Sequence, residues 1–216
     1  MNTINNFVDR IFVINIGTRK DKWKKMVEQF DRLGITNYER FDAYVPTNED
    51  INSDPNKFLL YQVLYFPGAI GCKYSHLQVI SEAKKRDYGR ILILEDDALF
   101  CEDFNNIFSS LVGALNIIDW DMLYLGANHE NIGEFISTNI RRCFTGYTTS
   151  SYILNSRMYD QILEEAPRKK LEIDNYYVQC IQNKGKTYAI TPNLVTQFES
   201  ISDISGKHAK YDFKNC

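Results

Sequence analysis

Continuous apolar runs alternate along the chain with segments whose apolar positions recur at helical spacing. Residues 10–16 are mostly apolar, and the strand expected at 90–94 has no polar interruption from Ile91 to Leu94, which is typical of strands buried on both faces. Between them, a helical pattern ends at Gly34, and a second strand is expected over 38–41. The apolar face of that helix is formed by Trp23, Met26, Val27, Phe30 and Leu33. This βαβ-like opening predicts an α/β fold with a Rossmann-type mixed sheet flanked by helices.

The rest of the chain continues the same alternation. Helices are expected at 72–86, 104–115, 156–165 and 173–183, and strands at 121–126, 134–137, 147–154 and 187–190. Gly126 is expected to end its strand in a turn. Because no Pro/Gly/Ser-rich linker divides the 216 residues, we expect one domain over 1–216. Its core would cover about 8–192, followed by an irregular C-terminal flap over 193–216.

Composition narrows the class of protein. The net charge of −3 leaves no large basic face, which argues against nucleic acid as a partner. An acidic protein that binds a nucleotide needs a local cationic group or a metal to meet the phosphates. The five cysteines are odd in number and form no Cys-x-x-Cys pair. They are expected to be reduced, mostly buried thiols, and neither a disulfide framework nor a zinc site.

The N-terminus is polar and lacks a signal-peptide pattern. The apolar run from Ile11 to Ile14 is far shorter than the ~20 residues that span a bilayer. We therefore expect a cytoplasmic protein without an integral membrane segment. The sequence leaves the oligomeric state open, a homodimer included.

The acidic triplet Glu95-Asp96-Asp97 directly follows the most apolar strand. Ligands of open α/β sheets bind beyond the carboxyl ends of the strands, and three adjacent carboxylates there repel one another unless something positive lies between them. All-oxygen ligands suit Mg²⁺ or Mn²⁺, which also bridge a diphosphate. Glu95 and Asp97 are two residues apart and are expected to face the ligand together. Asp96 would turn to backbone donors. The alternative is a solvated turn or a helix N-cap.

Six segments, in order, resemble glycosyltransferase family 25, the group with lipooligosaccharide and procollagen galactosyltransferases. The first is similar to the family's Val-Ile-Asn-Leu-x-x-Arg-x-Asp, the third to Gly-x-x-Gly-Cys-x-x-Ser-His, and the fourth to its Glu-Asp-Asp signature. The segments are 13–21, 40–43, 68–76, 92–100, 119–126 and 197–204. The chain departs from the family at two places near the expected donor pocket. Just after its Arg-x-Asp the family often has a second basic residue, whereas this chain has Lys22 and then Trp23. In the loop after Ala43, Tyr44-Val45-Pro46 stands in place of the family's frequent Asp-Gly.

The resemblance implies a GT-A-like domain, a nucleotide-sugar donor (usually a UDP-sugar), Mn²⁺ or Mg²⁺, and inversion at the anomeric carbon. It places Asn15 and Arg19 at the nucleotide end of the donor, where a helix start and a guanidinium favour a diphosphate. Ala43 would contact the base. Ser75 and His76, expected near a helix start, would contact the donor sugar or its phosphate. Alternatively, Arg19 is a solvated first-turn residue, Ala43 is an ordinary loop residue, and His76 is structural.

An inverting transfer also needs a base for the acceptor hydroxyl. By resemblance we predict Asp174, with Glu172 in reserve, although an Asp here also suits a helix N-cap. His208 would complete the metal shell with the triplet, or else lie exposed in the tail. Aromatic residues before Gly68 are candidates for the acceptor groove. These are Tyr61, Tyr65 and Phe66.

The predicted function is thus a metal-dependent inverting glycosyltransferase that moves a hexose to a hydroxyl on a glycan or protein. A catalytically inactive relative that binds glycans or acts as a scaffold is one alternative. A sugar nucleotidyltransferase is another, but it would need a Gly-rich, Lys/Arg-bearing loop after the first strand, and this chain has only Gly17-Thr18-Arg19. A phospho-receiver domain is disfavoured because its acidic pair follows the first strand.

Overall fold

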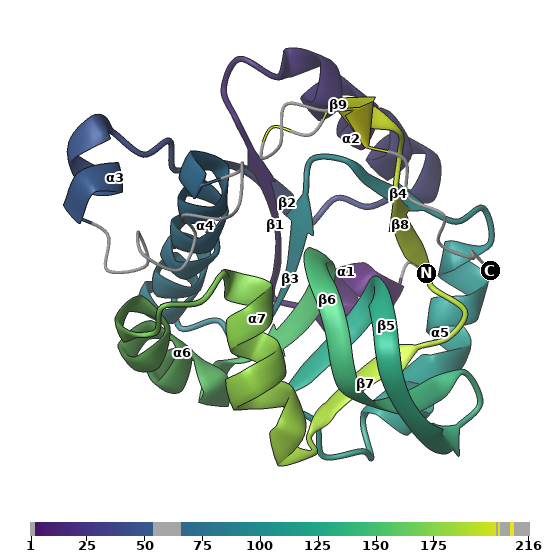
Figure 1. Cartoon of the computed structure of the whole chain (residues 1–216). Coiled ribbons are helices and arrows are strands. Elements are labelled where there is room, and N and C mark those ends of the chain that lie inside the picture. The colour runs from purple at the N-terminus through teal and green to yellow at the C-terminus, as the bar shows by residue number, and fades with distance from the viewer. Residues whose placement is uncertain (1–2, 54–65, 202, 204–207, 210–216) are drawn as a thin grey trace.

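A computed structural model describes residues 3–53, 66–201, 203 and 208–209. Its centre is a six-stranded mixed sheet in the order β2-β1-β3-β6-β5-β7 (Figure 1). The strands are β1 (Arg10–Asn15), β2 (Tyr38–Asp42), β3 (Arg90–Glu95), β5 (Met122–Ser137), β6 (Ile140–Asn155) and β7 (Thr187–Ile190). β1 pairs in parallel with β2 and β3, whereas β6 is antiparallel to β3 and β5. The predicted α/β fold is confirmed.

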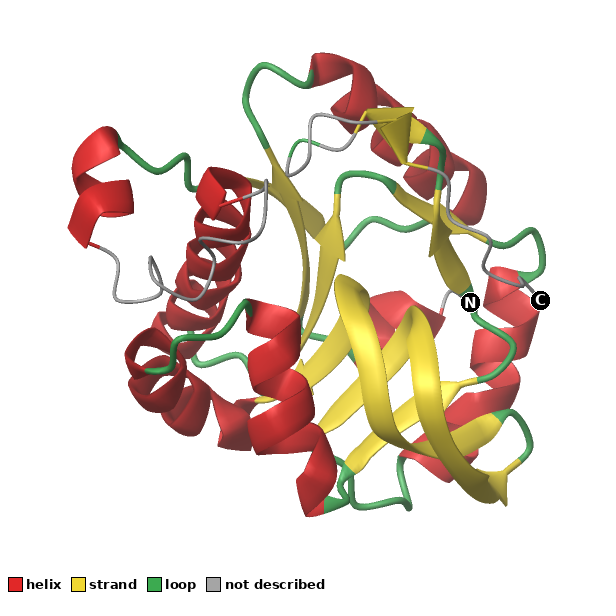
Figure 2. Cartoon of the chain, in the orientation of Figure 1, coloured by secondary structure: helices red, strands yellow, loops and turns green. Residues whose placement is uncertain are grey.

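Helices cover both faces of this sheet (Figure 2). One face carries α1 (Thr3–Phe7), α2 (Lys20–Leu33) and α5 (Phe104–Leu115). The other carries α4 (Phe66–Lys85), α6 (Tyr159–Glu165) and α7 (Ile173–Tyr176), which a π-helical turn over Tyr177–Ile181 extends. The short α3 (Asn48–Ser53) lies beside α4 (Figure 1). In such α/β folds ligands bind at the carboxyl ends of the parallel strands, which here are the ends of β1, β2 and β3.

The core explains why the first strands are continuously apolar. Along β1, Ile11 and Val13 pack with α1, α2 and α5, whereas Phe12 and Ile14 pack with α4. Successive side chains of a strand point to opposite faces, so a strand covered on both sides must be apolar at every position. Leu92 of β3 follows the same rule, in the cluster of Ile11. Gly34 ends α2 in the left-handed conformation, as the sequence predicts.

The strand at 121–126 does not end at Gly126, so that prediction is wrong. β5 continues through irregular pairing to Ser137 and forms a long hairpin with β6, which also absorbs the strands expected at 134–137 and 147–154. A Cβ at Gly126 would lie 1.6 Å from the carbonyl oxygen of Val195. The glycine is therefore needed because another backbone segment approaches closely, and not because the strand turns there.

α4 begins at Phe66, six residues before the predicted helix. Ser75 and His76 consequently lie in the middle of the helix and not near its start, which corrects their expected setting. A glycine is required at the nearby position 71, because a Cβ on Gly71 would lie 2.8 Å from the carbonyl oxygen of Tyr44. Gly71 thus lets the loop after β2 pack against α4.

The C-terminal segment is more regular than the sequence predicts. β8 (Val195–Gln197) pairs antiparallel with β4 (Ala98–Phe100), and β9 (Ser200–Ile201) pairs with β10 (His208–Ala209). Val195 is fully buried, so the start of the expected flap belongs to the core. Among the described residues, none of the helices combines the length and apolarity needed to cross a lipid bilayer.

Cys101 is disulfide-bonded, so the expectation of five reduced thiols is wrong at this position.

Candidate active site

A cavity of about 270 Å³ opens at the carboxyl ends of the parallel strands. It is lined by the end of β1, the loop Ala43–Pro46 after β2, the first half of α4 and the triplet Glu95–Asp97. Gln197 and Asp203 of the C-terminal segment close its far side. The volume is near the lower end of the ~300–1,000 Å³ typical of small-molecule sites. The strand that carries the triplet therefore ends at a pocket, where open α/β sheets bind ligands.

A buried lysine lies among the carboxylates of this pocket. The ammonium of Lys22 is 3.1 Å from Asp96, 3.5 Å from Asp97 and 2.7 Å from Asp203, and the lysine side chain is only 3% exposed. Burial alone would lower the pKa of Lys22, but the charges of Asp97 and Asp96 outweigh it and hold that pKa above its usual value. The chain itself thus supplies part of the positive charge that the triplet requires.

Asn15 fixes the middle carboxylate of the triplet. Its side-chain amide donates to Asp96 Oδ2 at 2.7 Å and to the backbone oxygen of Arg19 at 3.1 Å. Its oxygen accepts from Arg40 Nε at 2.9 Å. Asn15 is buried and does not line the cavity, so the structure does not bring this predicted nucleotide contact to the pocket. Its described role is to orient Asp96, through a side chain and not through the backbone donors that the sequence suggested.

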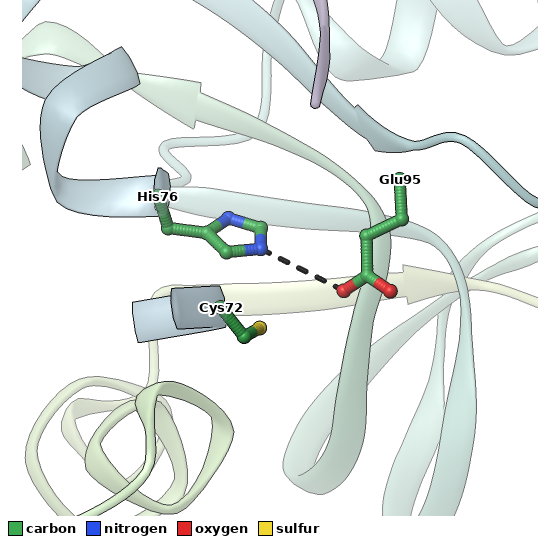
Figure 3. A group of neighbouring side chains, drawn as sticks. All are labelled: Cys72, His76 and Glu95. Atoms are coloured by element: carbon green, nitrogen blue, oxygen red, sulfur yellow. Dashed lines mark ion pairs between the residues drawn. The ribbon is translucent and has the colours of Figure 1, made fainter. Parts of the chain in front are cut away.

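Glu95 and His76 both line the cavity, and the imidazole of His76 points at the carboxylate of Glu95 (Figure 3). Its Oε1 lies 3.6 Å from His76 Nε2 and accepts a hydrogen bond from Thr149 Oγ1 at 2.8 Å. His76 Nδ1 is 2.8 Å from the hydroxyl of Tyr152, which fixes the ring. Burial raises the pKa of Glu95, but His76 and Thr149 more than offset it, so this pKa lies below its ordinary value. Glu95 is therefore ionised at neutral pH.

Asp97 is the least compensated member of the triplet. Its Oδ1 accepts from Gln197 Nε2 at 3.0 Å, and Lys22 lies at 3.5 Å. Burial and the negative charge of Glu95 raise the pKa of Asp97 to about 6. Burial likewise raises the pKa of Asp96, although the charge of Lys22 and the hydrogen bond from Asn15 act to lower it. A further positive charge beside Glu95 and Asp97 would relieve this repulsion.

The donor set decides which of the predicted metal ligands fit a hard divalent cation. Glu95 and Asp97 line the cavity, offer carboxylate oxygens and repel each other, all of which suits Mg²⁺ or Mn²⁺. Asp96 fits less well because both of its oxygens are engaged, by Asn15 and Lys22. His208 lies exposed in β10 and does not line the cavity, so the structure does not bring it to the triplet.

Arg19 and Ala43 flank the site in different ways. Arg19 precedes α2 and pairs with Asp21 and with Asp203 Oδ1, the latter at 2.5 Å. It stands outside the cavity lining, behind Asp203. Ala43 lines the cavity, but its N–H already donates to the oxygen of Asn15 at 3.0 Å. Ser75 also lines the cavity, where its hydroxyl donates to Gly71 and accepts from the N–H of Tyr44.

Asp174 lies next to the pocket without lining it. The N-cap of α7 is Glu172, so Asp174 is inside the first turn and not at the cap. Its Oδ1 accepts from the N–H of Asn175 at 2.7 Å. Burial raises the pKa of Asp174 despite this bond and one from Thr148, and the charge of Glu95 adds to the rise. Of the acceptor-groove candidates, Tyr61 and Tyr65 lie outside the described residues, as does the side chain of Phe66.

Sequence reasoning missed Lys22, Thr149, Gln197 and Asp203 as site residues. Only Lys22 carried a local signal. It precedes Met26 by four residues, so it lies on the buried face of α2, where a lysine needs a partner. Gln197 and Asp203 lie in the segment 197–204 that resembles the family, but the resemblance did not assign them to the site. Thr149 meets Glu95 through a contact across the fold, for which one sequence gives no pattern.

Comparison with known proteins agrees with the resemblance seen in the motifs. The family model described as "Glycosyltransferase family 25 (LPS biosynthesis protein)" matches residues 8–202. A glycosyltransferase 25 family member of Aedes aegypti is 27% identical over 189 residues, covering 82% of this chain and 31% of that protein. Procollagen galactosyltransferase 2 of Homo sapiens is 23% identical, covering 82% and 30%. The chain therefore spans about a third of the length of these relatives.

Among solved structures, a glycosyltransferase involved in glycosylation of the major capsid of PBCV-1 is similar over 85% of this chain and 81% of its own. The TM-score is 0.48 and the identity 13%. This likeness is too distant to say anything of the site, whose description rests on the contacts above.

Proposed function

Because the chain belongs to glycosyltransferase family 25, we propose that it transfers a hexose from a UDP-sugar to a hydroxyl group on a glycan or protein, with inversion at the anomeric carbon. The observation that carries the proposal is the pair Glu95 and Asp97 at the end of β3, which faces a pocket of ligand size. The name of the human relative supports galactose as the hexose. The activity is proposed for this chain, which is much shorter than those relatives.

In this proposal the donor diphosphate lies between the triplet and the first turn of α2. A divalent cation held by Glu95 and Asp97 would offset the charge that grows on the leaving diphosphate. Lys22, whose ammonium lies 3.1 Å from Asp96, lines the same pocket and would meet the same oxygens. Arg19 would join it once its partner Asp203 gives way. The pocket thus offers cationic groups for a diphosphate although the protein is acidic overall.

Asp174 is the proposed base on the acceptor side. An inverting displacement breaks the bond between the anomeric carbon and the diphosphate while the acceptor oxygen attacks from the opposite face. The acceptor proton passes to a carboxylate. The raised pKa of Asp174 makes it a stronger proton acceptor than an exposed Asp, and the charge of Glu95 at the pocket contributes to this rise. His76 would contact the donor sugar, since it lines the cavity.

The test is UDP release from a panel of UDP-sugars in the presence of Mn²⁺. We expect turnover of at least one UDP-sugar, reduced by about 100-fold or more in Asp97→Ala, since a group that stabilises developing charge contributes on that order. The matched control is Asp31→Ala, an exposed position on α2 that should keep full activity. UDP release at the wild-type rate by Asp97→Ala would refute the proposed role, and no turnover of any UDP-sugar by the wild type would favour an inactive relative.

A further inference from the structure

Three side chains of different chemistry converge at one wall of the cavity (Figure 3). They are Cys72 and His76 of α4 and Glu95 at the end of β3. Cys72 and His76 are four residues apart and therefore share a helix face. One ligand atom from each residue, a sulfur, a nitrogen and an oxygen, lies within 4.8 Å of the other two. The hard-cation site proposed above does not use the sulfur or the nitrogen.

The imidazole of His76 is arranged as in a metal ligand. Its Nδ1 is held 2.8 Å from the Tyr152 hydroxyl, which is itself 3.0 Å from the hydroxyl of Tyr177. Its Nε2 is buried without a hydrogen-bond partner and is directed at Glu95, 3.6 Å away. That separation is too long for a hydrogen bond. A histidine that is fixed through one ring nitrogen, and whose other nitrogen faces a carboxylate without a hydrogen bond, is suited to bind a metal.

We propose that Cys72, His76 and Glu95 bind a borderline-soft divalent ion, Zn²⁺ in particular, with a fourth position open to the cavity. Zn²⁺ binds thiolate sulfur, imidazole nitrogen and carboxylate oxygen, and three protein ligands leave one place for water or substrate. On binding, the thiol proton of Cys72 leaves to solvent as the sulfur becomes a thiolate ligand. This site runs against the sequence-based expectation that no cysteine serves a zinc site.

The site needs only a small adjustment. Bonds of ~2.0–2.3 Å in tetrahedral geometry place ligand atoms roughly 3.3–3.8 Å apart, so the widest gap must close by about 1 Å. Thr149 already links two of the ligands, since its hydroxyl donates to Glu95 at 2.8 Å and lies 3.9 Å from Cys72 Sγ. The proposal assigns this closure to rotation of the Cys72 and Glu95 side chains, because His76 is held by Tyr152.

Glu95 belongs to this site and to the proposed hard-cation site, which has a consequence that rests on the proposed function. An ion bound through Cys72 and His76 takes the carboxylate away from a cation beside Asp97. Zn²⁺ at a low ratio to protein should therefore inhibit the Mn²⁺-dependent release of UDP, and Cys72→Ser should relieve that inhibition. The site itself does not depend on the reaction.

The direct test is titration of the purified, reduced protein with Co²⁺, followed by absorption spectroscopy. Tetrahedral Co²⁺ bound to a thiolate gives a charge-transfer band in the near ultraviolet and intense visible bands. We expect these bands to saturate at one ion per chain and to be displaced by Zn²⁺. Cys72→Ser should remove the thiolate band, and His76→Gln should weaken binding by about tenfold or more. Cys180→Ser is the matched control and should leave the spectrum unchanged, because this partly buried free cysteine is not in the cluster.

Two results would overturn the proposal: no thiolate band in the wild-type protein, or a band that survives Cys72→Ser. The second result would direct attention to Cys143, whose sulfur is 3.7 Å from His129. If Cys72→Ser does not fold, the wild-type spectrum and His76→Gln still decide the matter. Asp97→Ala separates the two proposals, because it should retain the cobalt spectrum while losing UDP release.

Discussion

The ammonium of Lys22 lies 3.1 Å from a carboxylate oxygen of Asp96, and both side chains are largely buried in the lining of the proposed donor pocket. Three adjacent acidic residues at a strand end led us to expect a cation between them. The structure places a lysine there, paired with Asp96, Asp97 and Asp203. The positive charge of this site is thus partly built into α2, and a metal would act beside it at Glu95 and Asp97.

Removing the buried ammonium should be costly. Lys22→Met keeps most of the apolar stem of the side chain but leaves Asp96 and Asp97 without their cation. Breaking a buried ion pair typically costs about 3–5 kcal/mol. We expect the free energy of unfolding, measured in urea at neutral pH, to fall by about 3 kcal/mol or more. Lys24→Met on the exposed side of α2 should change it by less than about 0.5 kcal/mol. Equal stability of the two variants would show that Lys22 is not needed to compensate the carboxylates.

Asp203 holds the same cations that a diphosphate would use. Its carboxylate pairs with Arg19 at 2.5 Å and with Lys22 at 2.7 Å. Asp203→Asn removes the competing charge and should tighten UDP binding by about tenfold, equal to about 1.4 kcal/mol. Fluorescence or calorimetric titration measures this. Asp21→Asn, which frees only Arg19 at an exposed carboxylate, should have a smaller effect. Weaker UDP binding by Asp203→Asn would mean that Asp203 supports the donor instead of competing with it.

Because the backbone of Val195 passes close to Gly126, replacing Gly126 and replacing Gly113 by alanine should have opposite effects on stability. In Gly126→Ala the new Cβ would lie 1.6 Å from a backbone oxygen, so β5 or β8 must move. We expect a loss of about 3 kcal/mol or more in the free energy of unfolding, at the upper end of overpacking effects. Gly113→Ala, on the exposed side of α5 with nothing within 4 Å, should instead stabilise by about 0.5–1 kcal/mol. A well-tolerated Gly126→Ala would contradict the packing of β8 on the sheet.

His129 should make the protein less stable in mild acid. Burial lowers the pKa of His129 to about 4, against an ordinary value of 6.5. Between these values the unfolded chain binds a proton that the folded chain does not, so the free energy of unfolding falls as pH drops from about 6.5 to 4. Comparison of urea unfolding at several pH values with His129→Gln isolates this contribution. The variant should show a shallower decline over that window, and an identical pH profile would show that His129 titrates normally in the folded state.

Local sequence patterns were sufficient to predict strands that are covered on both faces and helices with a regular apolar face. The apolar run Ile91 to Leu94 could be recognised as a strand because both faces of β3 are covered. α5 was predicted with its observed bounds, because its apolar positions recur regularly. Gly126 misled because a glycine in a strand serves equally for a turn and for a close backbone approach. Which of the two applies depends on Val195, a contact that spans much of the chain.

The candidate site was predictable only at its centre. The triplet could be located because an acidic cluster after a buried strand has few placements in an α/β fold. Its surroundings depend on tertiary contacts: Thr149 reaches Glu95 from β6, and Gln197 reaches Asp97 from β8. Asn15 showed the opposite difficulty. A polar residue at the end of β1 suggests a ligand contact, but the side chain of Asn15 instead forms hydrogen bonds with Asp96 and Arg40.

Calorimetric titration of the protein with UDP, with and without Mn²⁺, tests most directly whether the end of β3 binds a nucleotide diphosphate through a cation. The account predicts binding of one UDP per chain that is at least about tenfold weaker without Mn²⁺. In Asp97→Ala this dependence on Mn²⁺ should be lost, while Asp31→Ala should bind as the wild type does. Wild-type protein that binds no UDP, or Asp97→Ala with unchanged Mn²⁺-dependent binding, would contradict it.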